Sequence, residues 1–86
     1  METRELEVLN ELVAAYLETG TAQTTQAVSE LMHADPSAGD TQAVRRLLVA
    51  LAETGHVKQL YPRGPWRPLR DSDGLRVRTV VTLEGP

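Results

Sequence analysis

The hydrophobic pattern of this 86-residue chain changes period once, at Gly55, and this change restricts the fold more than any other feature. Before Gly55, apolar residues recur at three- and four-residue spacings, which is the pattern of amphipathic helices. After it, apolar and polar residues alternate over residues 75–83, which is typical of a half-buried strand. The sequence therefore predicts helices followed by a β-hairpin.

Three segments carry the helical spacing, and we expect helices at about residues 4–18, 25–33 and 40–54. Glycine is placed to end the first helix at Gly20 and the third at Gly55. Thr24 or Thr25 is suited to cap the second helix, and Asp40 the third. The connection between the first two helices, rich in threonine and glutamine, leaves room for a very short strand.

The spacing of apolar residues in the third helix predicts which of its sides faces the core. Its apolar residues are spaced i, i+3, i+4 and i+7 and must point into the core: Val44, Leu47, Leu48 and Leu51. The polar residues between them are then expected to face outward: Thr41, Gln42, Arg45 and Arg46, with Val49 beside them. This helix therefore presents two adjacent arginines to its surroundings.

The hairpin is expected to span about residues 56–83. Its strands would be 56–61 and 75–83, joined by a long wing loop at 62–74, because three prolines and two glycines exclude a helix there. The loop carries a cluster of basic and aromatic residues: Arg63, Trp66, Arg67 and Arg70.

Length and composition exclude several classes of protein. A chain of 86 residues forms one domain, expected over residues 1–86, with a core too modest for a deep catalytic cavity. It contains no cysteine, which excludes disulfides and thiolate metal sites, and its two histidines make no persuasive metal site. We expect no enzyme activity, cofactor, metal, signal peptide or membrane span, and a cytoplasmic location.

Charge is distributed unevenly. Residues 1–40 contain one arginine and eight acidic residues, a net charge of −7, whereas residues 41–86 contain eight basic and four acidic residues, a net charge of +4. The net charge of −3 thus conceals a basic half, and this half is expected to face a polyanion.

Residues 43–57 resemble the third helix and following strand of the winged helix-turn-helix family of small bacterial and archaeal repressors. The matching features are Val44, Leu48 and Leu51, then Gly55 and an immediate strand at Val57. Residues 25–31 resemble the second helix of that family, and the likeness covers roughly residues 5–83. It implies an α+β fold, with three helices and a C-terminal β-hairpin wing, in which the third helix enters the DNA major groove.

The resemblance gives the outward residues a role. Arg45 and Arg46 are suited to guanine and Gln42 to adenine, with Thr41 beside them, although the same residues could form an ordinary solvated helix face. The loop arginines Arg63, Arg67 and Arg70 suit phosphates or the minor groove. Trp66 either joins this contact surface or folds back into the core.

We therefore expect a non-enzymatic duplex DNA-binding protein, either a transcriptional regulator or an architectural factor, that acts as a homodimer in the prokaryotic cytoplasm or nucleoid. The alternative is a winged-helix protein–protein interaction module within a larger assembly. The acidic first helix and a pI near 5.3 favour this alternative.

Overall fold

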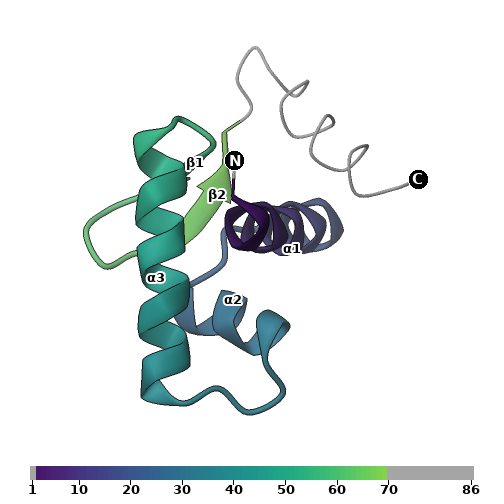
Figure 1. Cartoon of the computed structure of the whole chain (residues 1–86). Helices are drawn as coiled ribbons and strands as arrows, with labels where there is room; N and C mark the ends of the chain where they lie inside the picture. The colour runs from purple at the N-terminus through teal and green to yellow at the C-terminus, as the bar shows by residue number, and fades with distance from the viewer. Residues whose placement is uncertain (1, 70–86) are drawn as a thin grey trace.

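The computed structural model of the chain describes residues 2–69, in which three helices precede a two-stranded antiparallel sheet (Figure 1). In chain order the elements are α1 (Thr3–Thr19), α2 (Thr25–Met32), α3 (Ala38–Glu53), β1 (Val57–Gln59) and β2 (Trp66–Pro68). This is the α+β, winged-helix arrangement that the sequence predicts. In the described part of the chain, no helix is both long and apolar enough to cross a membrane.

The core lies where α1 packs against α3 and β2, and α2 packs against both α3 and α1 (Figure 1). Ten apolar side chains, drawn from every helix and both strands, are almost fully buried: Val8, Leu9, Leu12, Val13, Val28, Val44, Leu48, Leu51, Val57 and Trp66. Burial of each large one contributes about 1.5–3 kcal/mol. The predicted inward face of the third helix is confirmed at Val44, Leu48 and Leu51, while Leu47 is half-buried at the edge of the core.

The helix ends follow the predicted local chemistry. Gly20 ends α1 in the left-handed conformation, at φ 72°, and its N–H donates to the Tyr16 carbonyl at 2.7 Å. Gly55 adopts the same conformation after α3, at φ 82°. The Thr24 hydroxyl accepts from the Ala27 N–H at 3.0 Å and so caps α2, as predicted.

The prediction that Asp40 caps the third helix is wrong. Helix α3 begins at Ala38, and Ser37 is its N-cap. The Asp40 N–H donates to Ser37 Oγ at 3.1 Å, and the Ser37 N–H donates back to the Asp40 carboxylate at 3.0 Å. This reciprocal capping box satisfies two N–H groups, whereas Asp40 alone as a cap would satisfy one. Because α3 begins at Ala38, Gly39 lies in the first turn of this helix.

The prediction that residues 62–74 form one continuous wing loop is also wrong. The strand that returns along β1 is β2, which lies inside the segment 62–74 that was expected to be loop, and the connecting wing loop is only residues 60–65. Val57 pairs with Pro68 and Gln59 with Trp66. Pro68 is tolerated because it ends the strand, and burial of the large Trp66 side chain favours this register. Residues 75–83 lie outside the described residues.

β2 is also paired on its other edge. Gln23, in the connection between α1 and α2, forms an antiparallel bridge with Trp66 through two backbone hydrogen bonds, of 2.7 and 2.9 Å. The very short strand for which the sequence left room is thus present as a single bridging residue. It ties the start of α2 directly to the hairpin.

Loss of the capping box should destabilise the whole domain. Ser37→Ala removes the acceptor for the Asp40 N–H, and we expect the free energy of unfolding to fall by about 0.5–2 kcal/mol. Thermal melting followed by circular dichroism measures this. Ser37→Asp, which restores an acceptor at the cap, should melt close to the wild type. Equal melting of Ser37→Ala and wild type would contradict the capping role.

Stability should also depend on the charge of Asp40. The Ser37 backbone N–H, then its hydroxyl and finally the nearby His33 lower the pKa of Asp40 below 3.8. A carboxyl with a lowered folded-state pKa stabilises the fold above its ordinary pKa and loses that effect as the pH falls through the folded value. The melting temperature of Asp40→Asn should therefore lie below wild type at neutral pH, and the gap should narrow below pH 3.8. A gap independent of pH would contradict this.

Candidate nucleic-acid interface

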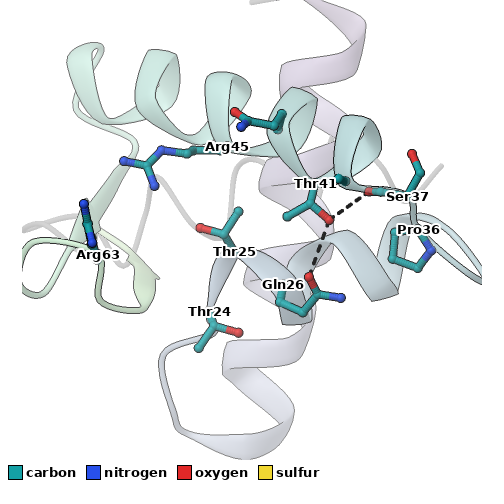
Figure 2. A pocket seen from close by; sticks show the side chains of 10 residues that line it. Thr24, Thr25, Gln26, Pro36, Ser37, Thr41, Arg45 and Arg63 are labelled. Atoms are coloured by element: carbon teal, nitrogen blue, oxygen red, sulfur yellow. Dashed lines mark hydrogen bonds between the residues drawn. The ribbon is translucent and has the colours of Figure 1, made fainter.

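Side chains from three parts of the chain line an open groove with a volume of about 590 Å³ (Figure 2). They come from the start of α2, from the turn and first half of α3, and from the wing loop: Thr24, Thr25, Gln26, Pro36, Ser37, Ala38, Thr41, Gln42, Arg45 and Arg63. We call this the cationic groove, because the charged residues that line it, among those the structure describes, are the two arginines.

Arg45 and Arg63 are brought together from segments 18 positions apart in the sequence. Both are exposed, and Figure 2 shows their guanidinium groups at the same end of the groove. Within residues 2–69, neither guanidinium forms an ion pair or a side-chain hydrogen bond. Their charges are therefore available to an anion entering the groove.

The backbone of Arg63 is strained. Residues 61–64 form a turn in which the Gly64 N–H donates to the Tyr61 carbonyl at 2.7 Å, and Arg63 adopts φ 62°. The third position of such a turn favours glycine, because a left-handed conformation costs other residues about 1–2 kcal/mol. A Cβ on Gly64 would lie 2.8 Å from the Tyr61 carbonyl oxygen, so glycine is required at that position. The strained position at the groove thus carries an arginine, which is a pattern associated with functional sites.

The outward face of α3 has the expected composition. Gln42, Arg45 and Arg46 are all exposed, and Val49 is 40% exposed. Gln42 and Arg45 line the cationic groove, and Arg46 lies one helical turn beyond Gln42 on the same side of the helix. Their use in base contacts stays a prediction.

Thr41 also lines the groove, but its hydroxyl is engaged with neighbouring residues (Figure 2). Its Oγ1 lies 3.2 Å from the Ser37 carbonyl oxygen, 3.2 Å from the buried Ser29 hydroxyl and 3.5 Å from Gln26 Oε1. These contacts join α2 to α3, so Thr41 links the two helices in addition to lining the groove. The sequence analysis placed Thr41 only on the outward face of the third helix and missed this role.

Trp66 is a core residue, and the prediction that it contacts DNA is wrong. The side chain is 2% exposed, and its Nε1–H donates to Thr25 Oγ1 at 3.0 Å. The alternative that the tryptophan folds back into the core therefore holds. This hydrogen bond from the indole N–H holds the Thr25 side chain at the start of α2, where Thr25 lines the groove.

The other two arginines that were expected in the wing loop are Arg67 and Arg70. Arg67 lies in β2, not in the loop, and its guanidinium carbon is 5.3 Å from the centre of the Tyr16 ring on α1. It does not line the cationic groove. The sequence analysis placed Arg63 and Arg67 in one loop, but Arg67 belongs to strand β2, so the two side chains have different surroundings. Arg70 lies outside the described residues.

The groove also contains residues that the sequence analysis did not propose as contacts. Thr24, Gln26 and Ser37 contribute hydroxyl and amide groups to its lining. Both Thr24 and Ser37 are N-caps, so two helix starts converge on the same groove. Capping residues in the sequence can indicate where a helix begins. That the starts of α2 and α3 line one groove depends on how these two helices pack, which the sequence pattern does not show. In residues 2–69, no group of three histidine or carboxylate side chains could hold a metal ion.

Comparison with known proteins supports the fold alone. Neither a protein-family model nor a curated protein matches the sequence. Among solved structures, the chain is similar to a crystal structure of a hypothetical protein at 2.2 Å resolution, with a TM-score of 0.73 and 21% sequence identity. The match covers 98% of this chain and 24% of the other, so this chain spans about a quarter of the length of that protein.

The burial of Trp66 has a direct spectroscopic test. It is the only tryptophan of the chain, so intrinsic fluorescence reports on this one site. We expect blue-shifted emission, weak quenching by acrylamide, and a red shift on unfolding, because the indole is excluded from water. Free tryptophan in the same buffer is the reference. Native emission and quenching like those of free tryptophan would contradict the core position.

Proposed function

We propose that this protein binds duplex DNA without catalysing a reaction on it, as a transcriptional regulator or architectural factor. One observation carries the proposal: Arg45 of α3 and Arg63 of the wing loop line the same groove, and no acidic residue of the described range 2–69 lines it. DNA binding depends strongly on the neutralisation of phosphates by arginine and lysine. A groove with two guanidinium groups that have no ion-pair partner within residues 2–69, and with several hydroxyl and amide groups, suits a phosphate backbone.

In this proposal α3 enters the major groove. The major groove of B-DNA is about 12 Å wide and accepts one α-helix. Gln42 and Arg45 lie in the first half of α3, the part of a recognition helix that usually reaches bases. Arg45 would donate two hydrogen bonds to guanine, and Gln42 would pair with adenine.

The wing would position the duplex. Arg63 lines the groove from the wing loop, and we assign it to the phosphate backbone beside the bases read by α3. Two copies bound to two half-sites would multiply this limited contact surface, so we propose a homodimer on DNA. The acidic residues of α1 do not line the groove, which reconciles the net charge of −3 with a polyanionic ligand.

Substitutions of Arg45 and Arg63 should change DNA binding in different ways. Arg45→Ala should reduce discrimination between preferred and random duplexes, by about 1–3 kcal/mol at the affected base pair. Arg63→Gly should weaken binding to all sequences alike and lower the slope of log K against log salt by about 0.9, because one phosphate contact is lost. Since glycine fits the left-handed turn without strain, Arg63→Gly should fold at least as stably as wild type. Fluorescence anisotropy with labelled duplexes at several salt concentrations measures all of these.

Arg67→Ala is the matched control, because this arginine lies against Tyr16 and outside the cationic groove. We expect it to bind DNA like the wild type. The proposal fails if random duplex does not bind at low salt, or if Arg67→Ala reduces affinity as much as the two groove substitutions do.

A further inference from the structure

A second concave surface lies between α1, the end of α2 and α3. It consists of two adjoining hollows, of about 260 and 410 Å³, which share Glu7, Met32 and His33. Between them they are lined by Arg4, Glu7, Val8, Glu11, Leu31, Met32, His33, Asp40, Ala43, Val44 and Leu47. We call this surface the acidic hollow.

The acidic hollow combines an apolar floor with a negatively charged rim. Val8 and Val44 are buried at the floor, and Met32, half-buried, is an adaptable side chain beside them. Leu31 at the mouth is 46% exposed. Among the residues that the structure describes, the rim contains three carboxylates, from Glu7, Glu11 and Asp40, and one arginine, Arg4. Their formal charges sum to −2 with His33 counted as neutral.

The acidic hollow and the cationic groove use different sides of α3. The helix contributes residues 40, 43, 44 and 47 to the hollow, and residues 38, 41, 42 and 45 to the groove. At 3.6 residues per turn, the centres of these two sets are about 160° apart around the helix. A ligand in the groove therefore leaves the hollow accessible.

We propose that the acidic hollow binds a cationic amphipathic helix from a partner protein. Amphipathic helices dock in grooves by laying apolar residues at i, i+3, i+4 and i+7 against an apolar floor. Lysine or arginine residues beside that stripe would face the rim carboxylates, of which Glu7 and Glu11 are one turn apart on the exposed side of α1.

The same charges argue against a second copy of the chain as the occupant. Two copies that met symmetrically at this surface would each present a rim with a net charge of −2, and like charges across an interface weaken it. A cationic partner experiences attraction from the same rim. Charge complementarity therefore selects the class of ligand.

A pair of synthetic helical peptides tests this with the full chain. One carries leucines at i, i+3, i+4 and i+7 with lysines beside them, and the other carries glutamates in place of the lysines. Binding is followed by anisotropy of the labelled peptide and by amide shifts of ¹⁵N-labelled protein. We expect the lysine peptide to bind, with shifts concentrated at residues 4–11, 31–33 and 43–47, and the glutamate peptide not to bind.

Charge reversal on α1 provides the matched comparison. Glu7→Lys/Glu11→Lys should weaken binding of the lysine peptide by about tenfold, the effect of two exposed ion pairs. Glu18→Lys reverses an exposed acid of the same helix that does not line the hollow, and should leave peptide binding unchanged. Circular dichroism checks that both variants fold.

Three results would overturn the proposal: equal binding of the two peptides, no effect of the double reversal, or shifts located elsewhere on the protein. A fourth contradicting result would come from sedimentation equilibrium. If the wild type self-associates and Glu7→Lys/Glu11→Lys abolishes this self-association, the hollow is an interface between copies of the chain. DNA binding is measured separately, through the cationic groove, so either proposal can fail without the other.

Discussion

The placement of the wing depends on Trp66. Its backbone bridges Gln23 on one side and pairs with Gln59 on the other, and its indole N–H holds Thr25 at the start of α2. Because these contacts come from one buried residue, they tie the connection, the second helix and the hairpin into one unit. The wing loop is consequently held where Arg63 lines the same groove as Arg45 of α3.

The second constraint is the burial of one side of α3. Leu48 and Leu51 are fully excluded from water, so the helix cannot rotate without exposing its largest apolar side chains. This leaves two free flanks that differ in chemistry. One contributes Arg45 to the cationic groove, and the other contributes Asp40 to the acidic hollow. A small domain thereby presents two surfaces of opposite charge, which fits a protein that joins DNA to a cationic partner.

The sequence predicted what local chemistry determines. Glycine ended two helices at the expected positions, a threonine capped the second, and the spacing of Val44, Leu48 and Leu51 gave the correct inner face of the third. It failed where contacts between distant residues decide. Three prolines and two glycines predicted a loop over 62–74, but the burial of Trp66 stabilises the pairing of the proline-flanked β2 inside that segment. No local pattern indicates that Arg63 and Arg45 line the same groove, because their placement depends on how the hairpin packs.

The most direct test of the central claim is an NMR titration of the ¹⁵N-labelled protein with a random-sequence duplex at low salt. The account predicts that amide shifts concentrate in the first half of α3, around Gln42 and Arg45, and in the wing turn at residues 61–64. The residues around Glu7 and Glu11 should stay unperturbed. Shifts confined to the α1 side of the molecule, or an unchanged spectrum at saturating DNA, would contradict the claim that this groove is a DNA-binding surface.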